Sequence, residues 1–160
     1  MSELELGSSL KGKIAATLIG MACAQRSNGE INFASPFVDD EGVDIIFFKK
    51  GGSGRAILAQ VKSRTMQSKL LSKGTFRVQV RRASFKPREG YYFIFVAFDE
   101  SGRELFNTLW FIPSVDFAKN LSGQTNKNVL VFQSRFTSKD MWEEYRMSLD
   151  KLPQRIVQIL

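Results

Sequence analysis

The amino-acid sequence predicts a mixed α/β fold in which a mixed β-sheet is flanked by an N-terminal and a C-terminal helix. Three observations predict this class. Apolar residues recur at helical spacing near the N-terminus, short β-rich segments separated by turn residues fill the middle, and a second helical stripe lies near the C-terminus. The length of 160 residues, without internal repeats or linker sequence, indicates a single domain over residues 1–160.

The N-terminal helix has a start signal, an apolar stripe and a stop signal. Ser8 or Ser9 can cap its first turn, because a serine oxygen accepts a hydrogen bond from a free backbone N–H. Asn28 and Gly29 tolerate left-handed backbone and predict its end. The residues at helical spacing are Leu10, Ile14, Leu18 and Met21.

A meander of three strands is expected next, over residues 31–38, 43–50 and 55–64. Each segment is rich in β-branched or aromatic residues, which favour the pleated surface of a sheet. The cluster Gly-Gly-Ser-Gly at 51–54 supplies the turn between the second and the third strand.

The second half of the sheet is predicted from four further segments. Residues 66–73 form either a basic linker or a short helix, and the alternation of apolar and cationic residues at 76–81 predicts a strand with one cationic face. Residues 91–98 are continuously aromatic or aliphatic, so we expect a central strand buried on both faces. The sheet is expected to continue over residues 109–112 and 129–132.

The C-terminal segment is predicted to be helical. Thr137 and Asp140 resemble a capping box at its start. Pro153 either kinks this helix or begins a new one that ends at Leu160. The apolar stripe consists of Trp142, Tyr145, Leu149 and Leu152.

The composition excludes several kinds of site. The chain has no histidine and a single cysteine, Cys23, which excludes Ser-His-Asp and Cys-His catalysis, an internal disulfide and a cysteine-rich zinc site. No apolar run approaches the roughly 20 residues of a membrane span, and the N-terminus lacks a signal-peptide pattern. We therefore expect a cytoplasmic protein whose chemistry, if it is an enzyme, depends on carboxylates, amides, lysines and an oxygen-bound metal ion.

Positive charge is concentrated in one part of the chain. Residues 49–88 contain twelve Lys or Arg and no Asp or Glu, although the whole chain has 23 basic and 16 acidic residues. Such a segment either binds a polyanion, because each neutralised phosphate releases counterions, or forms a solvated basic face. The complete lack of carboxylates over this length favours nucleic acid.

A small set of polar residues occupies the second and third predicted strands. Side chains alternate along a strand, so Gln60 and Lys62 project from one face while Val61 packs on the other. Asp44 opens the neighbouring strand within an apolar run. A carboxylate buried without a partner would be strongly unfavourable, so we expect a metal ion or Lys62 beside it.

This pattern resembles the PD-(D/E)XK nuclease superfamily. A helix is followed by Gly-Val-Asp at 42–44 and by Gln-Val-Lys-Ser at 60–63. The sequence is most similar to the variant in which glutamine replaces the second acidic residue, as in some group I intron-encoded endonucleases. The motifs cover residues 8–64, and the likeness extends loosely to about residue 117. The resemblance implies a restriction-endonuclease-like core and a hydrolase that cuts DNA.

The resemblance also implies a role for each residue of the motif. Asp44 would be the main ligand of Mg²⁺, with Mn²⁺ as an alternative, and the Gln60 amide oxygen and the Val61 carbonyl would complete the protein ligands. Lys62 would orient or activate the attacking water and stabilise the charge that grows on the phosphorane. The products would carry a 5′-phosphate and a 3′-hydroxyl.

Phosphate contacts are expected from the basic segment and from the end of the strand that carries Lys62. The alternative for the arginines is an edge-strand position at which charge suppresses aggregation. The predicted nucleic-acid-binding residues are Lys49, Lys50, Ser63, Arg64, Lys69, Lys73, Arg77, Arg81, Arg82, Lys86 and Arg88.

The sequence departs from the family pattern at two places. Gln60 is neutral, so the site has one negative charge fewer and is expected to bind Mg²⁺ more weakly. Many relatives have a glutamate on the first helix, four residues after the glycine of a Lys-Gly pair; here Lys11-Gly12 is followed by Ala16. Glu41, close to the aspartate in sequence, is a candidate to compensate.

Three functional hypotheses follow. The first is a Mg²⁺-dependent endonuclease that acts on duplex or branched DNA, as a homodimer because one site per chain cuts one strand. The second is a catalytically inactive module of the same fold that binds DNA through the basic segment; salt-sensitive binding without a cleaved product would distinguish it. The third is a structural or protein-interaction domain whose basic surface contacts an acidic partner protein and which has no affinity for DNA at physiological salt.

Overall fold

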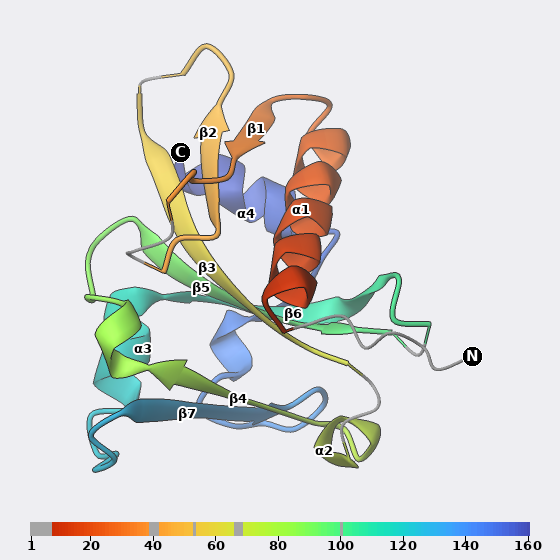
Figure 1. Ribbon diagram of the computed structural model, residues 1–160. Coiled ribbons are helices and arrows are strands. Elements are labelled where there is room, and N and C mark those ends of the chain that lie inside the picture. Colours follow the sequence, from red (N-terminus) through yellow and green to blue (C-terminus); the bar gives the residue numbers. More distant parts are fainter. Residues whose placement is uncertain (1–7, 39–41, 53, 66–68, 100) are drawn as a thin grey trace.

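Figure 1 shows the layered arrangement of the chain in a computed structural model, which describes residues 8–38, 42–52, 54–65, 69–99 and 101–160. The middle layer is a six-stranded mixed sheet in which β3 and β5 are parallel and all other neighbours are antiparallel. Its strands, in spatial order, are β1 (Ile31–Ala34), β2 (Ile45–Lys49), β3 (Ala56–Arg64), β5 (Tyr91–Phe98), β6 (Leu105–Pro113) and β8 (Arg146–Ser148). The predicted mixed sheet flanked by N- and C-terminal helices is confirmed.

Two helices, α1 (Ser8–Arg26) and α4 (Leu152–Ile159), cover one face of this sheet. The predicted stripe of α1 is only partly correct, because Leu10 and Met21 are 46% and 57% exposed. Small residues face the sheet instead, and the closest approach is at Gly20, where a Cβ atom would lie 2.5 Å from the Phe33 ring. The helix residues buried against the sheet are Ala15, Ala16, Ile19 and Cys23.

The buried thiol on α1 reports on this packing. Cys23 is fully buried, and burial raises the pKa of its thiol from 9.0 to about 12. Since the thiolate is the reactive form, we expect native protein to resist modification by a thiol-specific disulfide reagent at mildly alkaline pH. The same reagent should react with one thiol per chain in guanidinium chloride. Rapid stoichiometric reaction of native protein would contradict the packing of α1 on the sheet.

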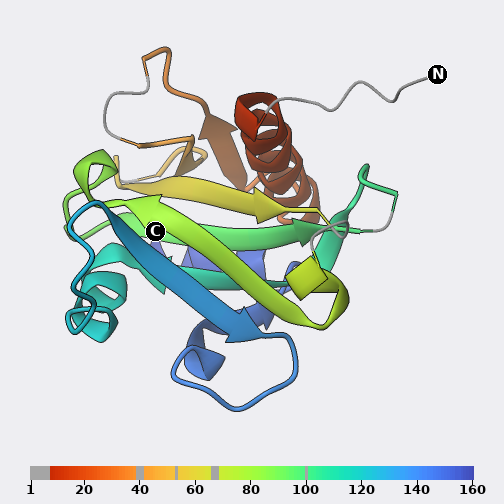
Figure 2. The same ribbon diagram turned by 60° about the horizontal axis from the view of Figure 1, so that its bottom comes forward.

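The opposite face of the sheet is covered by a second, two-stranded sheet and a helix. Strand β4 (Thr75–Arg81) pairs antiparallel with β7 (Val129–Arg135), and we call this pair the β4–β7 ribbon. Figure 2 shows it crossing in front of the main sheet. The helix α3 (Ser114–Asn120), which the sequence did not predict, packs beside it. The expectation that residues 76–81 and 129–132 belong to the main sheet is therefore wrong.

Aromatic side chains fill the space between the ribbon and the main sheet. Phe132 of β7 stacks on Phe95 of β5 with ring centroids 4.2 Å apart, and Phe76 of β4 lies 5.4 Å from Trp110 of β6. Isolated two-stranded ribbons are marginally stable in water, so this contact with the sheet stabilises the pair. The predicted alternation of β4 is confirmed, since its apolar residues are buried and its cationic residues are exposed.

The predicted helix over residues 137–152 is absent from the structure. The chain instead forms the 3₁₀ turn η2 (Glu143–Tyr145) and β8. A new helix, α4, begins at Leu152 with Pro153 in its first turn, so the alternative in which Pro153 begins a new helix is confirmed. The residues of the stripe separate because Trp142 packs under the ribbon whereas Leu149 joins the α1 side of the sheet. A continuous helix could not place them on opposite faces.

Other boundaries differ modestly from the prediction. Strand β1 ends at Ala34, β2 begins one residue after Asp44, and β6 starts as early as Leu105. The alternative of a short helix in the basic linker is correct, as α2 covers Lys69–Ser72. No helix in the described part of the chain is long and apolar enough to cross a membrane.

Candidate functional site

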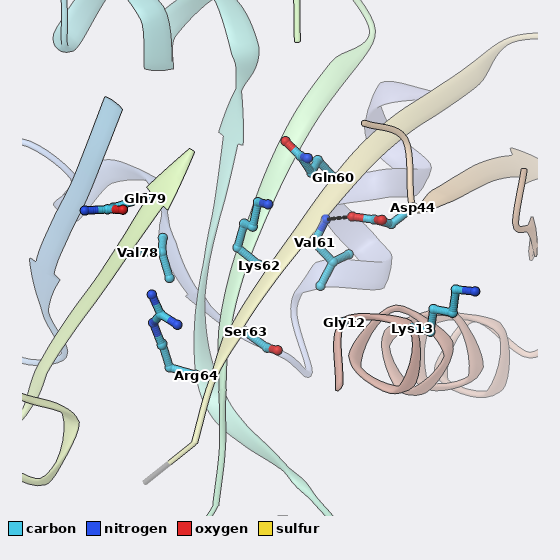
Figure 3. A pocket seen from close by; sticks show the side chains of 10 residues that line it. All are labelled: Gly12, Lys13, Asp44, Gln60, Val61, Lys62, Ser63, Arg64, Val78 and Gln79. Carbon is cyan, nitrogen blue, oxygen red and sulfur yellow. Dashed lines mark hydrogen bonds between the residues drawn. The ribbon is translucent and has the colours of Figure 1, made fainter. Parts of the chain in front are cut away.

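A pocket of about 350 Å³ opens beside β3, between α1 and the β4 strand of the ribbon. Figure 3 shows β3 crossing the middle of this pocket, with side chains of α1 on one side and side chains of β4 on the other. Its lining residues are Gly12, Lys13, Asp44, Gln60, Val61, Lys62, Ser63, Arg64, Val78 and Gln79. The pocket therefore brings together the three residues of the sequence motif, Asp44, Gln60 and Lys62.

Strand β3 places two of these side chains by simple alternation. Gln60 pairs in register with Phe93 of β5 and Lys62 pairs with Phe95, so both side chains lie on the ribbon side of the sheet. Val61 between them is 4% exposed and belongs to the core on the α1 side. The alternation expected from the sequence is observed.

The backbone of β3 holds Asp44 in place. The Asp44 backbone N–H donates to the Ala59 carbonyl oxygen over 2.9 Å, and its carboxylate Oδ2 accepts a hydrogen bond of 2.7 Å from the Val61 N–H. A charge-assisted bond of this kind is stronger than one between neutral groups. The Asp44 carboxylate is therefore held beside the backbone of Val61. The family resemblance implies that the carbonyl oxygen of this same residue is a metal ligand.

The segment that leads into Asp44 is confined on several sides. Gly42 has a positive φ of 70°, and a Cβ atom there would lie 2.4 Å from the Ser84 carbonyl oxygen and 3.0 Å from Gln60 Nε2. The Tyr91 hydroxyl donates to the Gly42 carbonyl oxygen over 3.0 Å. Any side chain at position 42 would therefore be strained and would displace its neighbours. The glycine lets the chain pass close to the amide of Gln60.

The amide oxygen of Gln60 has no hydrogen-bond partner among the described residues. Gln60 is 5% exposed, and its Oε1 makes no hydrogen bond within the described residues. A buried acceptor without a donor costs about 1–3 kcal/mol, so such an atom at a pocket is suited to hold a water molecule or a cation. Amide, carboxylate and carbonyl oxygens are the ligands that Mg²⁺ and Mn²⁺ prefer.

The described residues of this site include few carboxylates. Among the residues that the structure describes, no three His, Cys, Asp or Glu side chains are grouped so that they could hold a metal ion. Among the described lining residues of the pocket, Asp44 is the one carboxylate, and it lies together with neutral oxygens. This set of donors fits a hard divalent cation.

The sequence did not predict four of the lining residues, one of which is Val78 of β4. Lys13 and Gly12 come from α1, and Gln79 comes from β4 of the ribbon. A Cβ atom at position 12 would contact nothing within 4 Å, so the helix leaves open space there. A glycine within a helical pattern was the one available signal. Ala16, the position of the family's glutamate, is 3% exposed and lies in the core, and Glu41 lies outside the described residues.

The predicted nucleic-acid-binding residues fall into four groups. Ser63 and Arg64 line the pocket, and the Arg64 guanidinium donates from Nε to the Arg77 carbonyl oxygen over 3.0 Å. Other members lie exposed on the ribbon, on or just after α2, or in the loop that follows β4. These exposed residues are Lys69, Lys73, Arg77, Arg81 and Lys86.

Two arginines of the predicted set make contacts that stabilise the protein itself. Arg82 donates from Nε and Nη2 to the carbonyl oxygens of Asn126 and Gln124, at 2.7 and 2.8 Å. Arg88 lies 4.8 Å over the Tyr91 ring. Both guanidinium groups therefore make contacts within the protein that stabilise its loops.

The two lysines at the start of the basic segment lie away from the pocket. Lys49 forms an ion pair of 3.1 Å with Glu30, and Lys50 follows it in the turn after β2. Because β2 runs away from Asp44, these lysines lie at the opposite end of the strand, roughly 15–20 Å from the carboxylate at about 3.3 Å per residue.

Comparison with known proteins defines the class of fold. The fold is nuclease-like, since it is similar to that of a solved bacterial homing endonuclease. That structure, I-Ssp6803I, shares 19% sequence identity with the chain and gives a TM-score of 0.56, over 88% of this chain and 89% of the other. No protein-family model matches the sequence, and no curated protein matches it.

Proposed function

We propose that the chain is a metal-dependent endonuclease that hydrolyses phosphodiester bonds of duplex or branched DNA, as a PD-(D/E)XK enzyme of the glutamine variant. The observation that carries the proposal is the grouping of Asp44, Gln60 and Lys62 in one pocket. Two features support it. The fold is similar to that of a homing endonuclease, and the exposed Arg64 at the pocket would neutralise a phosphate.

Each residue of the pocket has a defined task in this proposal. Asp44 and the amide oxygen of Gln60 would hold Mg²⁺ together with the Val61 carbonyl, and the ion would supply charge neutralisation at the phosphate and a more acidic water. The Lys62 ammonium would position the attacking water and stabilise negative charge on the phosphoryl oxygens. Lys13 and Arg64, on either side, would bind the flanking phosphates.

A cleavage assay tests the proposal. Supercoiled plasmid and branched DNA would be incubated with the protein in Mg²⁺, Mn²⁺ or EDTA, and the cut ends would be analysed for 5′-phosphate. Nicked or linear product that depends on the metal ion supports the proposal. Absence of product on every substrate contradicts it. The homodimer expected from the sequence stays a prediction, which sedimentation with and without DNA would check.

A second candidate is a DNA-binding module that does not cut. Asp44 is the one carboxylate among the described lining residues of the pocket, and this favours the second candidate because Mg²⁺ affinity depends on the number of charged ligands. Its signature is DNA affinity that falls steeply with salt, without a metal-dependent product. A protein that neither binds nor cuts DNA would point to the third hypothesis, an acidic protein partner.

The replacement Gln60→Glu tests the identity of the metal ligands. A second carboxylate beside Asp44 is expected to raise Mn²⁺ affinity by roughly tenfold or more, since one additional charge pair at short range contributes more than 1 kcal/mol in a partly buried site. Titration of Mn²⁺ by electron paramagnetic resonance, without DNA, measures this directly. Gln79→Glu is the matched control, because it adds the same charge to the other side of the pocket. Equal gains in both variants would contradict the ligand assignment.

A further inference from the structure

The β4–β7 ribbon presents one polar face that the protein core does not use. Its inner residues pack on the main sheet, whereas the outer face carries four polar side chains, the cross-strand pair Arg77 and Gln133 and the residues Gln79 and Arg81; the half-buried Val131 and Val129 lie opposite the last two. None of these four side chains forms a hydrogen bond or an ion pair with another described residue. The outer face of the ribbon contains no acidic residue. These side chains are therefore available to a partner rich in acceptors.

We propose that this ribbon enters the major groove of duplex DNA and reads base edges through Gln79, Gln133, Arg77 and Arg81. The inference rests on the proposed function and extends it to sequence recognition. The major groove of B-form DNA admits a two-stranded β-ribbon, and each base pair presents a distinct pattern of donors and acceptors there. Glutamine pairs with the N6 and N7 atoms of adenine, and arginine pairs with O6 and N7 of guanine.

The ribbon is anchored well enough to position these side chains. Phe132 stacks on Phe95 at 4.2 Å from the inner face. The free edge of β7 is also closed, because the Gln124 amide donates to the Val131 carbonyl oxygen over 2.9 Å and accepts from the Val131 N–H over 2.7 Å. The edge is thus not available for pairing with another strand at Val131, and the outer face is left as the interaction surface.

The spacing of the side chains predicts the spacing of the bases. Successive outward residues of β4, Arg77, Gln79 and Arg81, are separated by roughly 6.6 Å, twice the strand rise of about 3.3 Å. This is about two base-pair steps of about 3.4 Å each. A strand that follows the groove would therefore contact every second base pair, with the glutamine between two arginines.

The position of the ribbon relative to the pocket locates the recognised bases. Gln79 and Val78 of β4 line the same pocket as Lys62. In Figure 3 both lie on the ribbon side of β3, and the Gln79 side chain is directed away from Lys62. The Arg64 guanidinium joins the two elements through its bond to the Arg77 carbonyl oxygen. Bases read by the ribbon would consequently lie beside the phosphate that is cut.

Selection of binding sites from a randomised duplex library tests the inference. The selection is carried out in EDTA, so that it measures binding without cleavage. The wild-type protein is expected to enrich a motif with informative positions two base pairs apart. Gln79→Ala is expected to lower the preference at one adenine on the order of tenfold or more, while its affinity for unrelated DNA and the salt dependence stay nearly unchanged. Gln133→Ala and Arg77→Ala should each relax a different position.

The control variant is Gln154→Ala, since Gln154 is an exposed glutamine on α4, on the other side of the main sheet. It should enrich the wild-type motif. Because all the replaced residues are exposed, the variants are expected to unfold at the wild-type temperature. An unchanged motif in all three ribbon variants, or no motif for the wild type, overturns the inference while leaving the proposed cleavage intact. A changed motif in a protein that does not cut DNA supports the ribbon and overturns the proposed function.

Discussion

Lys62→Ala is expected to lower the rate of DNA cleavage by roughly 10²–10⁴-fold, which is the range for loss of a positioned catalytic side chain. Lys62 projects from β3 into the pocket that also contains Asp44 and Gln60. The variant would lose the ammonium that stabilises charge on the phosphoryl oxygens. It would lose little stability, because the side chain is only half-buried and the strand is held by its neighbours. Single-turnover cleavage of plasmid DNA, with saturating protein, measures the chemical step.

The control for this experiment is Lys151→Ala, which removes an exposed lysine next to α4. Cleavage by this variant should equal that of the wild type. Binding of uncut DNA in EDTA should also be similar in Lys62→Ala and wild-type protein, because one phosphate contact contributes little to a salt-dependent total. Wild-type cleavage by Lys62→Ala would refute the assignment of the active site.

The second large effect is expected for Asp44→Asn. The replacement has nearly the same shape, and its amide oxygen can still accept the hydrogen bond that the Val61 N–H donates. The negative charge, however, is lost from a pocket whose other proposed ligands are neutral oxygens. We therefore expect metal-dependent cleavage to fall by roughly 10²–10³-fold, as for removal of a group that stabilises the transition state, and Mn²⁺ binding to become undetectable by electron paramagnetic resonance.

Two comparisons make this result specific. Asp150→Asn removes an exposed carboxylate that pairs with Arg26 at 3.2 Å, on the α1 side of the sheet, and it should cleave DNA like the wild type. Asp44→Ala removes the hydrogen-bond acceptor as well as the charge, so it should also lower the free energy of unfolding by about 1–3 kcal/mol. Wild-type Mn²⁺ affinity in Asp44→Asn would place the metal ion elsewhere.

The sequence was sufficient for the part of the site that depends on local geometry. The alternation of β3 predicts that Gln60 and Lys62 share a face opposite Val61, and the structure has this arrangement. The proximity of Asp44 follows from a hairpin whose turn is marked by glycines. These relations need only the period of a strand and a short connection between neighbours.

The remaining lining residues depend on contacts between distant segments. Periodicity indicates which side chains share a face but not which element packs on that face, so the ribbon and its Gln79 could not be placed beside the pocket. Lys13 was missed for the same reason, since the register of α1 over the sheet is set by small residues such as Gly20. The apolar stripe that includes Trp142 led to the wrong prediction of a helix. Apolar residues can also occur at helical spacing by chance in a segment that forms a turn and a strand.

The path of the C-terminal segment has a consequence for the way the molecule melts. Trp142 packs 5.1 Å from Phe132 beneath the ribbon, β8 then pairs with β6 at the edge of the main sheet, and Leu149 reaches the layer of α1. One stretch of chain thus connects both sides of the sheet. Loss of either layer would expose residues that support the other, so the two layers are thermodynamically coupled. Heat or denaturant should therefore unfold them in a single cooperative transition, detected alike by tryptophan fluorescence and by the reactivity of the Cys23 thiol.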